Sequence, residues 1–478
     1  MSPEYRATLD VEVAKFFYST NTAFNVADHP QWKKLVGMLC PGYTPPSSKR
    51  VGNELLSEVA NSQKKNMKNL LTGKEGTLVL DGWSNIHNQP VVATCLHVED
   101  EIFMLDSHDT GSMTKSADKC KDLAQSSITR AKEEFGCKVT SIVTDNAKAM
   151  ENMRKALQED DPDLIVYGCS SHWLNLLGND HSVSTITSRI TSVQKVFRNQ
   201  HKPNAWLLEK KGKKPILAGD TRWNSQLDMI QNFLNNRCIY QQIVQEQLSN
   251  EDFSFDNNII NTINDFNLAK NAMDLREQLL PIGIALDTCQ GDSTHIADAC
   301  HFWLEIDGNK DLNHQKTEKR VKQALTDAHL AAYLLHPQFR GEHLTVEQRE
   351  KATKWICEKS PDFINTLIAF QAKSSPFPES FFATTTVKPV NWWKAALGCG
   401  ADPAFCTLAV RLMSAPASSA SIERIFSSFG LIHNKLRNRL GPRKAADLLL
   451  CYRMLNHKLP QDKIIAIEMN EISDEDDL

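Results

Sequence analysis

Apolar residues recur at helical spacing through the first part of the chain. Phe16 and Phe17 follow Val13 by three and four residues, and a spacing of three recurs at Trp32, Leu35 and Met38. A face that repeats about every 3.6 residues is typical of an amphipathic helix, so helices are predicted over residues 1–40. A further helix is expected to open at Pro46, because a proline in the first turn gives up no needed N–H. Residues 1–72 are therefore predicted to form a helical N-terminal segment.

From residue 73 the apolar pattern changes from the period of a helix to that of a strand. Strands are predicted at 76–81, 90–98 and 101–106, and their short connections indicate an antiparallel meander. The pattern then predicts, in order, a helix at 116–135, a strand at 138–144, a helix at 146–158 and a strand at 163–167. This order of elements is that of the ribonuclease H-like fold.

Helical patterns dominate the remainder of the chain. Leu275, Leu279, Ile282 and Leu286 form one apolar stripe, and the helical pattern returns at 402–457. The predicted fold class is therefore α/β, a ribonuclease H-like mixed sheet interrupted by a large all-α insertion. After the N-terminal segment, the first part of the core is predicted at 73–225 and the helical insertion at 226–400. A closing helix with a dimerisation region is predicted at 401–458, and an acidic tail at 459–478 is expected to be disordered.

Composition changes this picture little. A hydrophobic content of 41% and a charged content of 23% are ordinary for a soluble globular protein. No apolar run approaches the roughly 20 residues needed to cross a bilayer, and residues 1–9 lack a signal-peptide core, so we expect an intracellular protein without a membrane partner. The net charge is −4, but residues 467–478 carry six acids and no base. Because the rest of the chain is then close to neutral, any affinity for DNA must come from local basic patches.

Two acids follow apolar strand residues. Asp81 and Asp145 each end a predicted strand, where side chains reach the rim of a sheet. Neighbouring carboxylates approach closely only if a cation holds them, and Mg²⁺ prefers oxygen ligands. Such ions activate a water and stabilise the leaving oxygen of a phosphodiester. The alternative for each residue is an ordinary turn or cap.

A third acid must come from a distant segment, and Glu423 is the candidate. Ser414 is expected to cap its helix and Pro416 to occupy the first turn. Ile422 and Phe429 belong to the buried stripe beside which Glu423 projects. The alternative is a solvated glutamate.

Several short segments resemble the hAT superfamily of DNA transposases. They occur in the family's order over roughly residues 10–460, with a long gap before the glutamate. The segments are Asp81-Gly-Trp-Ser, Thr144-Asp145-Asn-Ala, Cys169-Ser-Ser-His172-Trp-Leu-Asn-Leu, Thr221-Arg222-Trp223-Asn-Ser225, Ala331-Ala-Tyr-Leu-Leu-His-Pro337, Ser421-Ile-Glu423-Arg-Ile-Phe426 and Ala446-Asp-Leu-Leu-Leu450.

The resemblance implies an activity and a catalytic set. Asp81, Asp145 and Glu423 would be the catalytic, metal-binding acids, with Mg²⁺ or Mn²⁺ as cofactor. Excision would proceed through hairpins on the flanking DNA, after which a 3′-OH attacks target DNA. Such a protein works in the nucleus.

The resemblance also implies residues that handle DNA. Trp223 matches a tryptophan thought to support a flipped base, and an aromatic face suits that role. The alternative for Trp223 is a core aromatic. Arg222 could pair with a phosphate through two hydrogen bonds. This motif is preceded by a glycine-containing stretch with Lys210, Lys211, Lys213 and Lys214. These lysines are either phosphate contacts or part of a flexible solvated linker.

Cys169 and His172 match a family motif near the active site. We interpret His172 as a DNA or active-site contact and Cys169 as structural. Zinc would need a second ligand pair nearby, and none is evident, so zinc is not expected. The chain has twelve cysteines, no CxxC pair and no signal peptide, which favours reduced thiols.

The family's C-terminal block mediates dimerisation, which implies a homodimer or higher assembly. Leu448, Leu449 and Tyr452 belong to an almost continuous apolar run there. Part of this run must pack on the chain itself, so the alternative for each residue is the core of the same domain.

One departure from the family leaves the activity open. Family members usually begin with a BED-type zinc finger, whereas no Cys/Cys/His/His set precedes Cys40. The first hypothesis is an active transposase core. The second is a domesticated nuclear protein that dimerises and binds DNA or chromatin partners without catalysis. The third is a metal nuclease unrelated to transposition.

Overall fold

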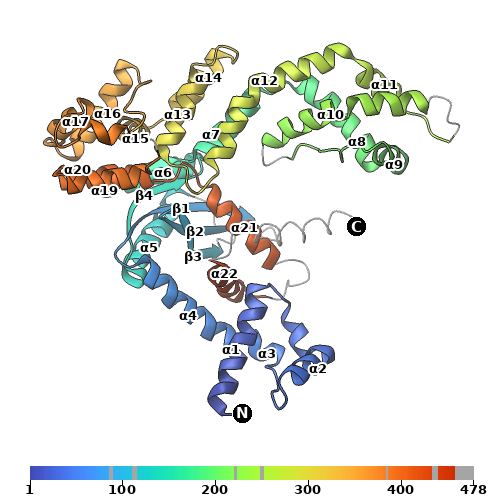
Figure 1. Cartoon of the computed structure of the whole chain (residues 1–478), viewed down its shortest axis with the longest axis horizontal. Coiled ribbons are helices and arrows are strands. Elements are labelled where there is room, and N and C mark those ends of the chain that lie inside the picture. Colours follow the sequence, from blue (N-terminus) through green and yellow to red (C-terminus); the bar gives the residue numbers. More distant parts are fainter. Residues whose placement is uncertain are drawn as a thin grey trace. The chain divides into compact units, whose positions relative to one another are not determined.

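The chain divides into two units, each with its own core. The computed structural model describes residues 1–84, 90–109, 116–219, 223–247, 252–383, 386–432 and 440–457. The first unit combines Met1–Tyr167 with Ser419–Leu478, and the second is Gly168–Ser418. Figure 1 shows the elements of both units. The acidic tail predicted at 459–478 lies outside the described residues.

The first unit begins with short helices, as predicted for residues 1–40. They are α1 (Pro3–Ser19), the 3-10 helix η1 (Phe24–Asp28), α2 (Pro30–Leu39), α3 (Ser48–Val51) and α4 (Glu54–Leu71). The expectation that Pro46 opens a helix is wrong, because the Ser47 hydroxyl accepts the Arg50 N–H and caps α3, which begins at Ser48.

Five strands form one mixed sheet in the order β3-β2-β1-β4-β5. They are β1 (Glu75–Ser84), β2 (Pro90–Val98), β3 (Glu101–Asp109), β4 (Lys138–Thr144) and β5 (Ile165–Gly168). β2 pairs antiparallel with both β1 and β3, which confirms the predicted meander, whereas β1 and β4 are parallel. β1 and β3 each continue three residues beyond their predicted ends, because pairing with β2 carries them on to Ser84 and Asp109.

Helices from both ends of the first unit's sequence cover this sheet. α5 (Ala117–Phe135) and α6 (Lys148–Asp160) share a core with the sheet residues Leu78, Leu80 and Ile142. α21 (Ala420–Ile432) contacts β1 and β3, and α22 (Pro442–Asn456) contacts α1, α4 and β3. Two of the helices that contact the sheet, α21 and α22, therefore lie more than 250 residues after β5 in the chain.

The second unit is built from helices, as the pattern after Trp223 predicts. They are α7 (Ser170–His181), α8 (Ser184–Asn199), α9 (His201–Glu209), α10 (Asn224–Glu246), α11 (Asn257–Asn264), α12 (Phe266–Cys289), α13 (Ile296–Asp307), α14 (His314–Ala324), α15 (Asp327–Leu335), α16 (Val346–Lys359), α17 (Phe363–Gln371), α18 (Glu379–Phe382), α19 (Pro389–Gly398) and α20 (Pro403–Ser414). No helix in the described part of the chain is both long and apolar enough to span a bilayer.

The helices α7, α8 and α9 pack in the second unit. Their buried residues Leu177, Phe197 and Leu207 belong to the same core as Phe233 of α10 and Leu279 of α12. The domain boundaries predicted from sequence instead grouped these three helices with the sheet.

Candidate active site

Asp81 and Asp145 lie at matching positions on two paired strands. The parallel ladder of β1 and β4 ends with Leu80 opposite Thr144, and each acid is the next residue. Four residues earlier, the hydroxyls of Thr77 and Ser141 share a hydrogen bond of 2.5 Å across the same register. Because side chains alternate between the faces of a strand, Asp81 lies on the face of β1 on which Thr77 and Ser141 meet, and Asp145 directly follows β4 at the matching position.

The two carboxylates also organise their own backbone. Asp81 Oδ1 accepts the Gly82 N–H at 2.7 Å, and Asp145 Oδ1 accepts the Ala147 N–H at 3.0 Å in the turn before α6. Both side chains are half-buried. The turn interpretation therefore holds for Asp145, and its second oxygen takes no part in that bond.

Arg154 stabilises the end of β4, a role that was not predicted from the sequence. Its guanidinium is buried and donates a hydrogen bond to the Asp145 carbonyl oxygen at 2.7 Å and another to the Thr144 hydroxyl. A buried arginine needs such partners, since an unpaired buried charge is very costly. Its position on the apolar face of α6, between Met150 and Leu157, was the only signal in the sequence.

Glu423 belongs to the same unit and lies in the first turn of α21. Ile422, Ile425 and Phe429 are buried on one side of this helix, and Glu423 beside them is exposed. A carboxylate in the first turn is favoured by the positive end of the helix dipole. Since α21 contacts β1, the strand that carries Asp81, the fold places all three acids on neighbouring elements.

The start of the Glu423 helix differs from the prediction. Ser414 ends α20 and does not cap α21, and Pro416 lies in an isolated antiparallel bridge with His295. Ala417 donates its N–H to the Thr294 carbonyl at 2.8 Å, which holds this segment extended. Residues engaged in strand-like pairing cannot also form the first turn of a helix, so α21 starts only at Ala420.

The three acids lie on neighbouring elements, but their side chains are not arranged around a common metal position in the described structure. Among the residues that the structure describes, no group of three or more His, Cys, Asp or Glu side chains is arranged to hold a metal ion. The donor set of three carboxylates has the oxygen chemistry that Mg²⁺ or Mn²⁺ prefers. Binding at this position therefore requires the side chains to turn toward a shared ion.

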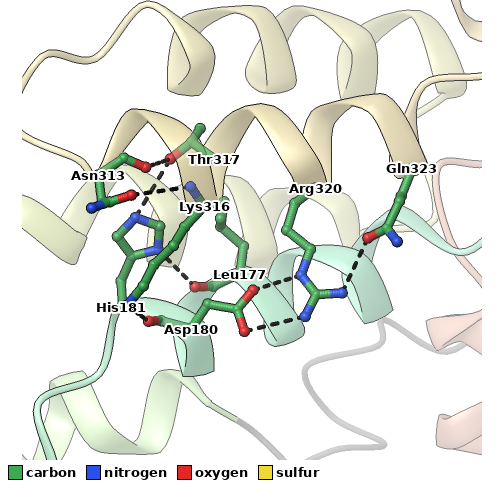
Figure 2. Close-up of polar contacts among 8 residues, drawn as sticks. All are labelled: Leu177, Asp180, His181, Asn313, Lys316, Thr317, Arg320 and Gln323. Carbon is green, nitrogen blue, oxygen red and sulfur yellow. Dashed lines mark hydrogen bonds and ion pairs between the residues drawn. The ribbon is translucent and has the colours of Figure 1, made fainter.

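Cys169 and His172 open α7 in the second unit. Cys169 is the N-cap residue and is buried, in agreement with a structural role, whereas His172 in the first turn is exposed. The other end of α7 is tied to α14, as Figure 2 shows. The Arg320 guanidinium donates to both carboxylate oxygens of Asp180, at 2.6 and 3.2 Å, and lowers the pKa of that carboxyl. His172 therefore projects from a helix that is firmly held.

Trp223 is a core residue in this structure. Its side chain is 2% exposed, its indole Nε1–H donates to Ser182 Oγ at 2.8 Å, and its ring lies against Gly178 of α7. The core interpretation therefore describes the structure, and stacking on a flipped base would require the ring to leave α7. Arg222 lies outside the described residues.

Two asparagines of the family-like motifs have structural roles that the sequence did not reveal. Asn175 Oδ1 accepts the Trp223 backbone N–H at 2.8 Å, and Asn224 Nδ2 donates to the Gly283 carbonyl of α12 at 3.1 Å. The motif that begins at Cys169 and the motif around Trp223 are thus joined, and the second is fastened to α12.

Lys213 and Lys214 are exposed, but their segment is not a flexible linker. Asn236 of α10 bonds both the N–H and the carbonyl of Lys213, at 2.9 and 2.8 Å, and Asn232 Nδ2 donates to the Lys214 carbonyl at 2.9 Å. The expectation of a flexible stretch is therefore wrong. A role of the two side chains in DNA binding stays a prediction.

Leu448, Leu449 and Tyr452 lie in the core of the first unit. All three side chains are buried on α22, which contacts α1 and α4. Asn456 at the end of this helix donates to the Ser19 carbonyl of α1 at 2.9 Å. These side chains serve the chain's own packing, and their predicted role in dimerisation stays a prediction.

Replacing Leu449 with alanine is expected to lower the free energy of unfolding by about 2–5 kcal/mol, because it leaves a cavity beneath α22. Urea unfolding at two protein concentrations measures this change, which should not depend on concentration. Arg443→Ala, at an exposed position of the same helix, serves as the control and should change stability by less than about 0.5 kcal/mol. A dimer that dissociates while subunit stability is unchanged would contradict the core assignment.

Comparisons with known families agree with the motifs. A domain of unknown function, DUF659, matches residues 46–198, which span the sheet, α7 and most of α8. The hAT family C-terminal dimerisation region matches residues 371–455, which include α21 and most of α22. No curated protein matches the chain significantly. These two matches support a hAT-family transposase-like protein with a region for self-association.

Proposed function

We propose that this protein is the core of a DNA transposase that cleaves and transfers DNA strands in the nucleus. Asp81, Asp145 and Glu423 would form its catalytic set. The observation that carries the proposal is the register of β1 and β4, which puts Asp81 beside Asp145 while the Glu423 helix packs on β1.

The sheet supports a ribonuclease H-like fold for this core. The order β3-β2-β1-β4-β5, with three antiparallel strands followed by a parallel β4, is the arrangement expected from the sequence of elements. In open α/β sheets, ligands bind beyond the carboxyl ends of the strands, at the point where the strand order reverses. Asp81 and Asp145 follow the last paired residues of the two parallel strands at this point, so the fold and the acids support the same site.

The roles of the residues follow from their chemistry. The three carboxylates would hold Mg²⁺, which activates the attacking oxygen and neutralises charge on the leaving oxygen when it is bound. Asp145 would be held in place for this by its bond to Ala147 and by Arg154, which donates to the Asp145 carbonyl. His172, Arg222, Lys213 and Lys214 would contact the DNA. The phosphodiester is then cut as the attacking oxygen bonds to phosphorus and the bond to the leaving oxygen breaks.

Nicking of a supercoiled plasmid tests this proposal. The wild-type protein is expected to nick DNA with Mg²⁺ and to lose the activity in EDTA. Asp81→Asn keeps the oxygen that accepts the Gly82 N–H but removes the charge, and it should reduce the rate at least about 100-fold. Glu159→Gln, an equal loss of charge at the exposed end of α6, should retain the rate. Equal nicking by the wild type and Asp81→Asn would refute the catalytic assignment.

A further inference from the structure

We infer that α8, α9 and the segment after α9 form a surface that binds the phosphate backbone of DNA. We call this surface the basic edge and define it by five cationic residues: Lys195, Arg198, Lys211, Lys213 and Lys214. The inference deepens the proposed function and rests on it in so far as the ligand is DNA. Of these five residues, the sequence alone indicated Lys211, Lys213 and Lys214 as candidate phosphate contacts, but not Lys195 or Arg198.

Positive charge is concentrated in this part of the second unit. Residues 184–219 contain eight Lys or Arg residues and one acid, Glu209, in a chain whose net charge is −4. In the structure, α8 contacts both α9 and α10, so these charges lie on one packed group of helices at the end of the unit seen in Figure 1. A local surplus of this kind raises the concentration of a polyanion near the surface.

Two of the other three cations form ion pairs within the unit, and the third donates to a backbone carbonyl. Arg189 pairs with Asp265 at 2.9 Å, Lys210 pairs with Glu246 at 2.8 Å, and Lys202 Nζ donates to the Asp252 carbonyl at 3.2 Å. For the five residues of the basic edge, the described part of the chain supplies no ion pair. Four of them are exposed, and Arg198 is half-buried. Their charges are thus available to a ligand.

A tight turn leads from α9 into the lysine segment. Lys211 has a positive φ of 59°, and the Gly212 N–H donates to the Leu207 carbonyl at 2.9 Å. A Cβ at Gly212 would lie 2.2 Å from Leu207 Cδ1, so the turn requires glycine there. The direction in which the chain leaves α9 is therefore set by packing.

A buried amide network then fixes the lysine segment to α10 and α8. Asn232 and Asn236 bond the backbone of Lys213 and Lys214, and the Gln194 amide donates to Asn232 Oδ1 at 3.0 Å. Tyr240 donates its hydroxyl to Gln194 Oε1 at 2.8 Å. The same network thus holds the lysine segment and the part of α8 that carries Lys195.

This construction suits a phosphate backbone. Duplex DNA presents one negative charge per roughly 1.7 Å of its axis, so a row of cations on one fixed surface can meet several phosphates together. Because the backbone of the lysine segment is already ordered, binding costs less conformational entropy than it would from a flexible linker. An acidic protein segment is the competing ligand, and a titration with a poly-glutamate peptide separates it from DNA.

The test measures binding without metal, so that it does not depend on cleavage. The triple variant Lys211→Gln, Lys213→Gln and Lys214→Gln is titrated against a fluorescent DNA duplex in EDTA at several salt concentrations. The slope of log affinity against log salt should become shallower by about 0.9 for each phosphate that the variant no longer neutralises, and affinity at low salt should fall at least about 10-fold. The control is Lys322→Gln, Lys351→Gln and Lys354→Gln, three exposed lysines of the same unit that already pair with glutamates. Its slope should equal that of the wild type.

The outcomes distinguish this inference from the proposed function. A shallower slope in the first variant alone supports the basic edge, even if the plasmid is not nicked. If the wild type binds DNA and the triple variant has the same slope as the wild type, the basic edge is overturned and the carboxylate site is unaffected. No binding of DNA by the wild type overturns both. A variant that binds DNA normally but no longer binds a poly-glutamate peptide shows that the surface serves an acidic protein, which also overturns the inference.

Discussion

Asp145→Asn is expected to reduce Mg²⁺-dependent nicking at least about 100-fold while leaving DNA binding in EDTA unchanged. The substitution is nearly isosteric, and the asparagine oxygen can still accept the Ala147 N–H that Asp145 Oδ1 accepts at 3.0 Å. The bonds from Arg154 go to the Thr144 hydroxyl and to the carbonyl of residue 145, so they also survive. The substitution removes the negative charge that a cation requires.

The double variant Asp81→Asn with Asp145→Asn sharpens this prediction. If both acids hold the same metal, the second substitution removes little that the first has left, and the double variant should be about as slow as the slower single variant. Independent sites would instead multiply their losses. Nicking rates of the four proteins, with thermal unfolding to verify folding, provide the measurement. Multiplicative losses would contradict a shared site.

Gly178→Ala is expected to destabilise the second unit by about 3 kcal/mol, an effect near the upper end for overpacking. The added Cβ would lie 2.2 Å from Trp223 Cδ2 and 2.4 Å from Cε2. The ring cannot retreat freely, because Ser182 accepts its N–H and Asn175 accepts the backbone N–H of the same residue. Either the ring or α7 must therefore shift. Thermal unfolding, monitored by tryptophan fluorescence, measures the loss of stability.

Two further variants show whether the clash with Trp223 is the cause. Trp223→Leu alone should destabilise because it leaves a cavity, yet in combination with Gly178→Ala the two losses should be less than additive, since the smaller side chain makes room for the new methyl group. Gly398→Ala is the matched control, because nothing lies within 4 Å of a Cβ there. Additive losses would show that the ring is not what restricts residue 178.

The order of elements and the positions of the acids could be predicted because they depend on local patterns. The change from a period near 3.6 to a run of apolar strand residues marks β1, and the same signal marks β4, so Asp81 and Asp145 were found without the structure. Leu275, Leu279, Ile282 and Leu286 were likewise expected to be buried, and all four are. The family-like motifs around Glu423 added the third acid, which no local signal separates from a solvated glutamate.

Features that depend on distant partners could not be predicted in this way. Whether Leu449 faces a second chain or its own core is determined by α1 and α4, which lie several hundred residues earlier in the chain. Leu35 and Met38 belong to an apolar stripe with regular helical spacing, yet both side chains are exposed. An apolar stripe indicates that one face of a helix can be buried, but the packing of other segments determines whether that face is buried.

The candidate site shows the same division. The local sequence was sufficient to find both acids, but it placed Asp81 at the end of its strand. Pairing with β2 carries β1 on to Ser84, so only Asp145 directly follows its strand. The matching register of the two acids, the contact of the Glu423 helix with β1, the burial of Trp223 against Gly178 and the fixed lysine segment all arise from contacts between residues far apart in the chain. Such contacts depend on how whole elements fit together, which no single segment of sequence specifies.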